Sequence, residues 1–416
     1  MLWVKSSSFR EKIYYIIIAL FMAFPVIDYI LRDILPIPLI SSLWDEMLLA
    51  GGLMLVCIRL IFGSPRRSTR ITKQIFVLIL IGLAYLTLDL ISLSVNLEGF
   101  RAVFQYMFVF FIGFYLIDRP EHIKSLLALA VITGSLIGLY GIYQWIIKVP
   151  MPSGWVDTTE AVKTRAFSII GSPNALGSQM AMLAPVALGL FMEEKNLLKK
   201  SLWLAMAAVM AACLVFTGSR GAWLAFAGAI GLLGVIYDRR ILFLGIAGAV
   251  AAVLFVPAVT ERVTYLFTPE YMMKSAQSGR ISRWLDAYDQ MRNSPLFGAG
   301  LGHYGGAVAR RTYSVPYTDN YYLKTMAEMG LLGVTMFFWL ILGSLKEGYN
   351  AIKKLSSPGL KYMAAGMLGG LSVIALHNFV ENIFEIPYLN TYFWLVAGLL
   401  ASLPFAATRM GGGPVD

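Results

Sequence analysis

The sequence has few of the residues on which soluble metalloenzymes and secreted scaffolds depend. Of its 416 residues only 14% are charged, two are cysteines and three are histidines. Cys57 and Cys213 lie inside apolar runs, which excludes a disulfide framework. The histidines are scattered without metal-ligand spacing, and the chain has no P-loop or zinc motif. We therefore expect no metal, no cofactor and no domain that couples the protein to a nucleotide.

Long apolar runs dominate the chain instead. Hydrophobic residues make up 58% of it, which is more apolar surface than a soluble domain of this length can bury. The sequence predicts an all-α polytopic membrane protein with about twelve transmembrane helices. The predicted spans lie near residues 13–31, 43–62, 75–93, 100–117, 124–147, 175–192, 202–217, 220–237, 240–258, 321–345, 361–379 and 388–406.

The net charge of +10 is distributed as a topology signal and does not indicate a nucleic acid partner. Most of the basic excess falls in alternate short loops, which the positive-inside rule assigns to the cytoplasm. Both termini are then expected inside, and the loops near 148–174, 217–220, 259–320 and 380–388 are expected outside. The basic loops contain Lys5, Arg10, Lys12, Arg66, Arg67, Arg70, Lys73, Arg119, Lys124, Lys195, Lys199, Lys200, Arg239, Arg240, Lys346, Lys353, Lys354 and Lys361.

The stretch 259–320 is the one long polar interruption among the spans. A connection of this length is either functional or disordered. Its aromatic residues, its arginines and the Gly-rich turn 298–302 argue against disorder. We expect the spans to act as a scaffold that holds this outer loop over a substrate.

Arg220 lies in the short turn Thr217-Gly218-Ser219-Arg220-Gly221 between two predicted spans. An arginine at a membrane boundary is costly unless it has a partner or an anionic ligand, and a guanidinium matches the geometry of phosphate oxygens. The alternative is an arginine that snorkels to lipid headgroups. The motif therefore indicates either a phosphate contact or an interfacial anchor.

Arg280, Arg283 and Trp284 are spaced to share one face of an amphipathic helix. The same spacing is typical of a helix that lies on the membrane surface with Trp284 as its anchor. Further along the loop, Asp319 and Asn320 precede Tyr321 at the start of the next span. Asp319 is a candidate helix N-cap and also a candidate general base, and these two roles are compatible.

Two further polar segments lie in the outer loops. Arg165 precedes Ser172-Pro173-Asn174, where the chain re-enters the membrane, and is a candidate second phosphate contact. His303 and His377 are the histidines expected near the outer face.

The order of these motifs resembles the O-antigen ligase and polymerase superfamily of bacterial membrane glycosyltransferases. The motifs are Arg-Ala-Phe-Ser…Ser-Pro-Asn, Thr-Gly-Ser-Arg-Gly, Gly-Arg-x-x-x-Trp, Pro-Leu-Phe-Gly-x-Gly-x-Gly and Asp-Asn-x-Tyr-Leu…Glu-x-Gly. The resemblance covers roughly residues 160–400. It implies an enzyme of the bacterial inner membrane that takes glycans from undecaprenyl diphosphate.

The resemblance also implies residue roles. Arg220 and Arg280 correspond to the arginines that hold the donor diphosphate, and an arginine at the position of Arg165 is typical. The expected partners are an undecaprenyl-diphosphate-linked oligosaccharide donor, a glycan or lipid-linked acceptor, and membrane lipids. Arg283, Trp284, Asn320, Tyr321 and Asn174 are expected to support the site.

The chain departs from the family pattern at the base. The usual His-Asn pair at the end of the outer loop is replaced by Asp319-Asn320, so either Asp319 or His303 is expected to fill that role. A transporter of the same lipid-linked sugars is the rival class. Its arginines should line a central cavity, whereas here they gather on one side.

The predicted organisation has three parts. Residues 1–159 form N-terminal spans, residues 160–406 form the ligase-related core with the outer loop, and residues 407–416 form a disordered cytoplasmic tail.

Overall fold

The computed structural model describes residues 8–62, 67–87, 90–151 and 164–410. The structure of these residues is entirely helical, in agreement with the predicted fold class. The principal helices are α1 (Phe9–Met22), α2 (Phe24–Tyr29), α3 (Pro38–Ile61), α4 (Arg70–Leu86), α5 (Leu93–Phe104), α6 (Val109–Leu116), α7 (Pro120–Ile146), α8 (Pro173–Glu193), α9 (Leu197–Phe216), α10 (Arg220–Ile236), α11 (Arg239–Phe255), α12 (Pro257–Tyr265), α13 (Pro269–Gln277), α14 (Arg280–Asn293), α15 (Ala307–Tyr313), α16 (Tyr321–Lys354), α17 (Pro358–His377) and α18 (Pro387–Met410).

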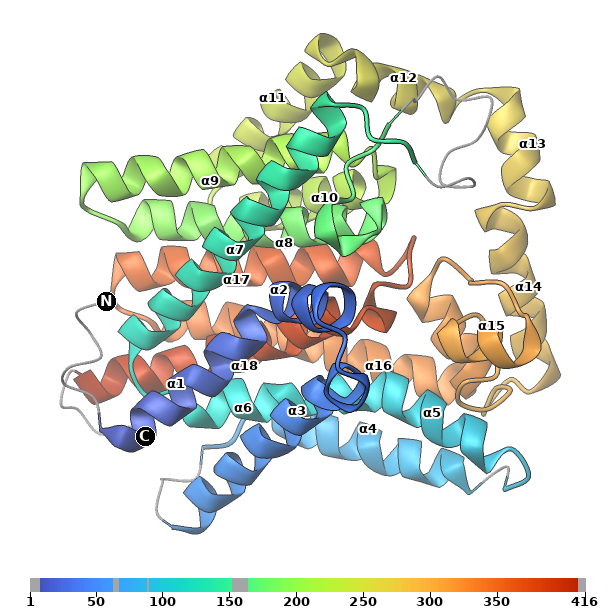
Figure 1. Ribbon diagram of the computed structural model, residues 1–416, viewed down its shortest axis with the longest axis horizontal. Helices are drawn as coiled ribbons and strands as arrows, with labels where there is room; N and C mark the ends of the chain where they lie inside the picture. Colours follow the sequence, from blue (N-terminus) through green and yellow to red (C-terminus); the bar gives the residue numbers. More distant parts are fainter. Residues whose placement is uncertain (1–7, 63–66, 88–89, 152–163, 411–416) are drawn as a thin grey trace.

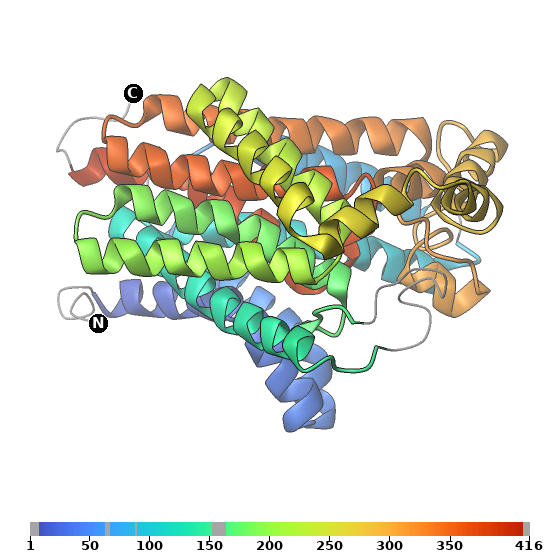
Figure 2. The ribbon, with the colours of Figure 1, turned by 90° about the horizontal axis from the view of Figure 1, so that it is seen from above.

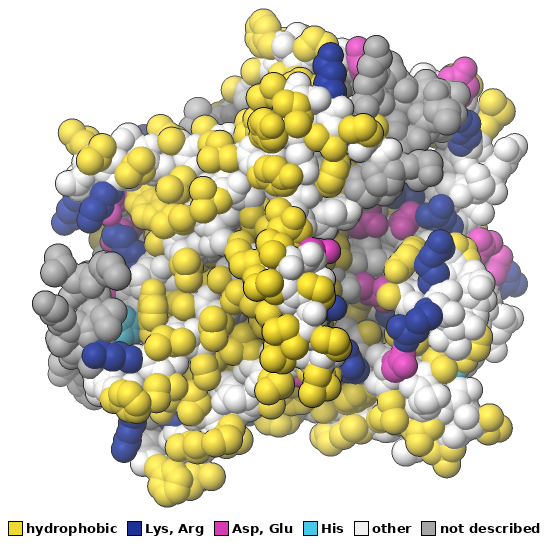
Figure 3. Space-filling view, in the orientation of Figure 1, with side chains coloured by type: hydrophobic (Ala, Val, Ile, Leu, Met, Phe, Trp, Pro, Cys, Tyr) yellow, Lys and Arg dark blue, Asp and Glu magenta, His cyan; other side chains and the backbone are white. Residues whose placement is uncertain are grey.

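The long helices form a bundle whose two ends differ (Figures 1 and 2). Hydrophobic side chains cover much of the face between these ends in the view of Figure 3. The short helices α13, α14 and α15 gather at one end, together with the start of α16. The connection between α8 and α9 lies at the opposite end. The predicted outer loop is therefore a set of short helices that cover one end of the bundle.

Helical residues lie in each of the twelve predicted spans, but the count of twelve transmembrane helices is not confirmed. Within the described residues, seven helices are long and apolar enough to cross a membrane, or up to nine if each of two bent pairs counts as one span. The seven are Leu93–Leu116, Pro120–Ile146, Pro173–Glu193, Leu197–Phe216, Tyr321–Lys354, Pro358–His377 and Pro387–Thr408.

Three predicted boundaries differ from the structure. The first predicted span is broken at Ala23, where Phe9–Met22 meets Phe24–Ile34 at 68°. Pro25 lies in the first turn after the break, where its missing N–H costs no hydrogen bond. The span predicted over 75–93 begins earlier and ends at Leu86. At the C-terminus α18 continues to Met410, and residues 411–416 of the predicted tail lie outside the described residues.

Helices α8, α17 and α18 form the buried centre of the bundle. In the most apolar stretch of each of these helices, at least 72% of the residues are buried. Glycines allow α17 to approach α8 closely, because a Cβ on Gly366 would lie 2.5 Å from the carbonyl oxygen of Pro185. Small residues at helix contacts are the usual way in which membrane helices approach one another. The central helices thus provide a rigid base for the loops at their ends.

Helix α16 is interrupted near its start at Gly330, whose φ of 63° and ψ of −165° are not helical. The Gly-rich stretch 295–300 supplies the missing hydrogen bonds. Ala299 and Gly300 donate to the carbonyls of Ala327 and Glu328, each at 2.9 Å, and Leu331 donates to the carbonyl of Pro295 at 2.8 Å. The Pro-Leu-Phe-Gly-x-Gly motif therefore fixes the loop to the break in α16.

We expect Gly330→Ala to destabilise the protein. A Cβ there would lie 2.4 Å from the backbone carbon of Leu296, and this backbone region is almost restricted to glycine. The strain alone costs about 1–3 kcal/mol, so the thermal unfolding midpoint in detergent should fall clearly. Gly231→Ala is the control, because nothing lies within 4 Å of a Cβ at Gly231. Equal midpoints for the two variants would contradict this role for Gly330.

Candidate functional site

Three of the predicted site residues are connected through one carboxylate that the sequence did not single out. Glu381, in the connection between α17 and α18, accepts a hydrogen bond from Asn174 Nδ2 at 2.5 Å and one from Arg280 Nη2 at 3.3 Å. Asn174 Oδ1 in turn accepts from Arg165 Nη2 at 3.0 Å. Glu381 and Asn174 thus join Arg165, next to α8, to Arg280, the first residue of α14.

The hairpin between α9 and α10 adds Arg220 to this region. Gly221 packs against His377 and Val380, since a Cβ there would lie 2.7 Å from His377 Nε2 and 2.8 Å from Val380 Cγ2. Glu381 directly follows Val380 in the chain, so the start of α10 lies beside the segment that contacts Arg280. The guanidinium of Arg220 lies 5.0 Å from the ring centroid of Tyr271 and 5.9 Å from that of Tyr265. These contacts are cation–π interactions that orient the side chain.

Arg262 of α12 joins Arg165, Arg220 and Arg280 as a fourth arginine in this region. No motif in the sequence had singled it out. Its Nε would lie 3.3 Å from a Cβ on Gly218, and Arg165 Nε would lie 3.6 Å from the same point. Gly218 has a φ of 59°, so both its conformation and its neighbours require glycine. Arg165 also donates to the carbonyl of Thr217 at 2.7 Å. The Thr-Gly-Ser-Arg-Gly motif therefore packs against Arg165 and Arg262 at Gly218 and contributes Arg220.

Helix α14 also positions Asp319. Arg283 Nη1 donates to Asp319 Oδ2 at 2.5 Å, and Trp284 Nε1 donates to the carbonyl of Asp319 at 3.3 Å. The three predicted residues of α14, Arg280, Arg283 and Trp284, thus contact outer-loop segments of the protein itself. The predicted helix is confirmed as α14. Its arginines and Trp284 contact Glu381 and Asp319 of the protein, unlike those of a helix that lies only on the membrane surface.

The N-cap of α16 is Asn320, which corrects the sequence-based assignment of Asp319. Asn320 Oδ1 accepts from the backbone N–H groups of Tyr322 and Leu323 at 3.1 and 3.0 Å. Its own N–H donates to Asn382 Oδ1 at 3.1 Å. Asp319 lies one residue earlier with a φ of 51°, a left-handed conformation that aspartate tolerates. Its carboxylate is therefore not used for capping and points towards Arg283.

Two other predicted residues, His303 and Tyr321, make contacts with other parts of the protein. His303 Nδ1 lies 3.0 Å from the carbonyl oxygen of Leu301, and its ring stacks on Tyr313 with centroids 5.4 Å apart. These contacts and the neighbouring Asn96 place His303 on the α5 side of the loop. Tyr321 is buried against Phe337 and Phe384 in the core. Tyr321 thus supports the start of α16 through packing.

Lys324, Glu328 and Glu385 form a buried group of charged side chains that connects loop segments close to the site. Lys324 Nζ lies 2.8 Å from Glu328 Oε2 and 3.2 Å from Glu385 Oε1, and all three side chains are at most 7% exposed. Glu328 also accepts from the N–H of Tyr304, and Glu385 accepts from the N–H of Ala307. Lys324 and Glu328 lie four positions apart on one face of α16. Glu385 connects that pair to the α17–α18 segment that carries Glu381.

Lys324→Met should therefore be strongly destabilising. It leaves the carboxylates of Glu328 and Glu385 buried without their cation, and breaking a buried pair in this way costs about 3–5 kcal/mol. Lys353→Met, on an exposed position of the same helix, is the matched control. The measurement is the thermal unfolding midpoint of both variants in the same detergent. A Lys324 variant as stable as the Lys353 variant would show that the cation is not needed.

The electrostatics at the end of the bundle favour an anionic ligand. Arg165, Arg220, Arg262 and Arg280 converge on a region where Glu381 is the carboxylate in direct contact with Arg280. Burial raises the pKa of Glu381, the nearby Asp319 carboxylate raises it further, and Arg280 opposes both effects. An anion bound to Arg280 would compete with the Glu381 carboxylate for the guanidinium. Because its pKa is raised, Glu381 takes up a proton more easily when that contact is lost. Within the described residues, no three His, Cys, Asp or Glu side chains are grouped in a way that would hold a metal ion.

Glu381 was missed because a single carboxylate in a short loop carries no motif. The signal available in the sequence is its place in the short outer connection 380–388, the same side to which the candidate arginines were assigned. Arg262 was visible only as one of several basic residues in the long loop.

Comparison with known proteins gives one finding. Residues 205–338 match the family model described as O-Antigen ligase. The matched stretch runs from α9 into α16 and includes Arg220, Arg280 and Asp319, whereas Arg165, Asn174 and Glu381 lie outside it. No curated protein matches the chain.

Proposed function

We propose that the protein transfers a glycan from undecaprenyl diphosphate to an acceptor hydroxyl on the outer face of the bacterial inner membrane. The match of residues 205–338 to the O-antigen ligase family supports this proposal. The family indicates a glycosyltransferase-type enzyme in a multi-pass membrane protein. The observation that carries the proposal is the convergence of Arg165, Arg220 and Arg280 at one end of the bundle.

The arginines act on the leaving group of the donor. A diphosphate carries several negative charges within a few ångströms, and guanidinium groups donate to its oxygens in pairs. As the bond between the anomeric carbon and the diphosphate oxygen breaks, negative charge grows on that oxygen. Arg220 and Arg280 stabilise this charge, and Arg165 holds the diphosphate from the α8 side. The tyrosines next to Arg220 and the carboxylate of Glu381 orient the two guanidiniums beforehand.

Asp319 acts on the acceptor. The acceptor hydroxyl oxygen attacks the anomeric carbon from the side opposite the diphosphate, so the configuration inverts, and its proton passes to Asp319. The ion pair with Arg283 holds this carboxylate, and the bond from Trp284 holds the backbone carbonyl of Asp319. Both partners lie on α14, the helix that presents Arg280. His303 lies on the α5 side of the loop and is the less suited of the two candidate bases. The reaction as written requires no metal ion.

The experiment uses purified protein in detergent with an undecaprenyl-diphosphate-linked oligosaccharide and a chelator. Chain length and free undecaprenyl diphosphate are followed by mass spectrometry. Growth of the lipid-linked chains, or release that depends on an added acceptor, is expected, and these results separate a polymerase from a ligase. No release with any acceptor, together with movement of the substrate across a liposome membrane, would overturn the proposal in favour of transport.

A further inference from the structure

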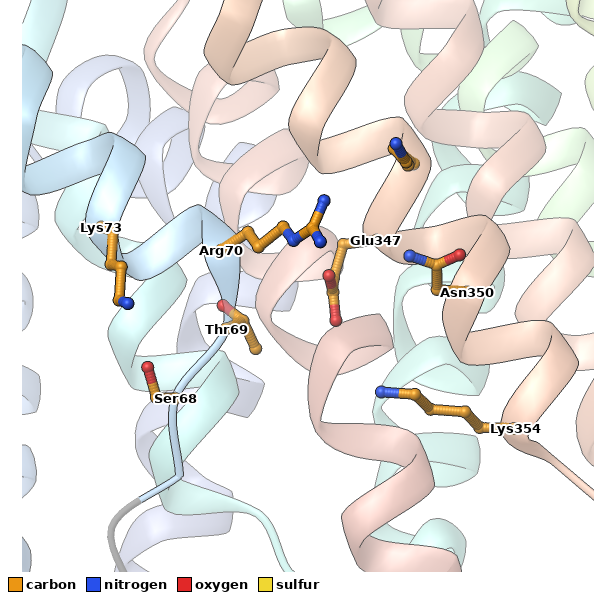
Figure 4. Close-up of a pocket in the computed structure, with 8 residues that line it drawn as sticks. Ser68, Thr69, Arg70, Lys73, Glu347, Asn350 and Lys354 are labelled. Atoms are coloured by element: carbon orange, nitrogen blue, oxygen red, sulfur yellow. The ribbon is translucent and has the colours of Figure 1, made fainter.

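A pocket at the opposite end of the bundle has no role in the proposed reaction. Its volume is about 490 Å³, and it lies between the start of α4 and the last turns of α16 (Figure 4). After its interruption at Gly330, helix α16 continues to Lys354, which corresponds to about 35 Å. The pocket is therefore separated from Asp319, at the start of α16, by most of the length of this helix.

The pocket is strongly basic. It is lined by the side chains Ser68, Thr69, Arg70, Lys73, Lys346, Glu347, Asn350 and Lys354. Four of these are cations and one is a carboxylate. Among the residues that the structure describes, Arg70, Lys73, Lys346 and Lys354 form no ion pair. Cations more than 270 positions apart in sequence thus line one cavity and outnumber its single carboxylate, which favours an anionic ligand that has several oxygens.

A hydrogen bond next to the pocket holds α4 and α16 together. Gln74 Nε2 of α4 donates to the carbonyl of Trp339 in α16 at 2.9 Å. A Cβ on Gly343 would lie 2.1 Å from Gln74 Oε1, so glycine is needed for the side chain of Gln74 to fit. The spacing between the cations is therefore fixed by the packing of α4 on α16.

An exposed apolar stripe continues from the cations along each helix. On α4, Val77 and Leu80 follow Lys73 at i+4 and i+7 and are 39% and 65% exposed. On α16, Leu342 and Trp339 precede Lys346 at the same spacings and are 61% and 44% exposed. Residues at these spacings share one face of a helix. The two stripes run from the basic pocket towards the middle of the bundle, as the chains of a bound lipid would.

We propose that this pocket binds the phosphate headgroup of an anionic phospholipid, whose acyl chains lie along the stripes of α4 and α16. The phosphate oxygens accept from Arg70, Lys73, Lys346 and Lys354, while Ser68 and Asn350 offer neutral hydrogen bonds. A soluble phosphate compound shares the headgroup chemistry but leaves the stripes unused. The proposal is independent of the catalytic reaction at the other end.

Native mass spectrometry tests this proposal on the full-length protein in detergent. The probe is an equimolar mixture of dioleoyl phosphatidylglycerol and dioleoyl phosphatidylcholine. The protein should retain the anionic lipid preferentially, and Lys73→Gln with Lys346→Gln should reduce that preference by roughly fivefold for each cation removed. The control, Lys195→Gln with Lys199→Gln, makes the same charge change at the α8–α9 connection and should leave the preference unchanged.

Three outcomes would overturn the proposal. Equal retention of the two lipids by the unmodified protein, or an equal loss in the two double variants, would show that only general surface charge acts. Displacement of the retained lipid by millimolar glycerol 1-phosphate would show that the pocket takes soluble phosphates and does not select a lipid. All four substituted lysines are exposed. Unfolding midpoints close to that of the unmodified protein are therefore expected, and they verify that the variants fold.

Discussion

Arg280→Lys is expected to reduce glycosyl transfer by about 10²- to 10³-fold, the usual loss when one preorganised donor to a developing oxyanion is removed. Lysine keeps the positive charge but cannot donate in parallel to two phosphate oxygens, and it cannot reach Glu381 with the planar geometry of the guanidinium. Arg220→Lys should give a loss of the same order, because the contacts with Tyr265 and Tyr271 orient a flat guanidinium.

The measurement is the initial rate of undecaprenyl diphosphate release from the lipid-linked donor. Arg292→Lys is the matched control, since Arg292 lies on the same helix, is 67% exposed and pairs only with the exposed Asp289 within the described residues. Its rate should stay within about twofold of the unmodified enzyme, as is usual for exposed pairs. Undiminished rates in both the Arg280 and Arg220 variants would refute the bidentate contact.

Asp319→Asn is expected to reduce the rate by about 10²- to 10⁴-fold, the range for the loss of a general base. The amide keeps the size of the side chain but cannot take the acceptor proton. His303→Gln should change the rate only by a few-fold, because His303 contacts Leu301 and Tyr313 and lies on the α5 side of the loop. The measurement is single-turnover transfer to a saturating acceptor.

Arg283→Met separates the two roles of Asp319. If the carboxylate served only to hold Arg283, removing the arginine would reduce the rate as much as Asp319→Asn does. As the base, Asp319 should still accept the acceptor proton in the Arg283 variant, so the loss of rate should be smaller than in Asp319→Asn. Asp289→Asn controls for charge on α14, since Asp289 is exposed. A larger loss in His303→Gln than in Asp319→Asn would reverse the assignment of the base.

The helical class and the positions of the apolar helices followed directly from the length of the hydrophobic runs, since a span must be apolar over a fixed thickness. The number of crossings did not follow in the same way. Helix α10 has 17 residues, shorter than a full span, and the first apolar run is broken at Ala23 by a bend that hydropathy does not register. Pro25 lies in the first turn after this break, but a proline in an apolar run does not by itself show where a helix bends.

The arginines of the site were predictable because each lies in a short motif with glycine or tryptophan beside it. The carboxylate that joins them was not. Glu381 approaches Arg280 and Asn174 across 101 and 207 positions of sequence, and only the packing of α8, α14 and α17 brings them together. The role of the stretch 295–300 was hidden for the same reason, because its partner is a break in α16 about thirty positions away.

Equilibrium binding of undecaprenyl diphosphate, undecaprenyl monophosphate and undecaprenol to the purified protein tests the arginine site most directly. If Arg220 and Arg280 hold the diphosphate, it should bind at least about tenfold more tightly than the monophosphate, which corresponds to 1.4 kcal/mol. The alcohol should bind weakest, and Arg280→Lys should abolish the difference between diphosphate and monophosphate while Arg292→Lys keeps it. Equal affinities for all three lipids, or a preference that survives in Arg280→Lys, would contradict a diphosphate site at these arginines.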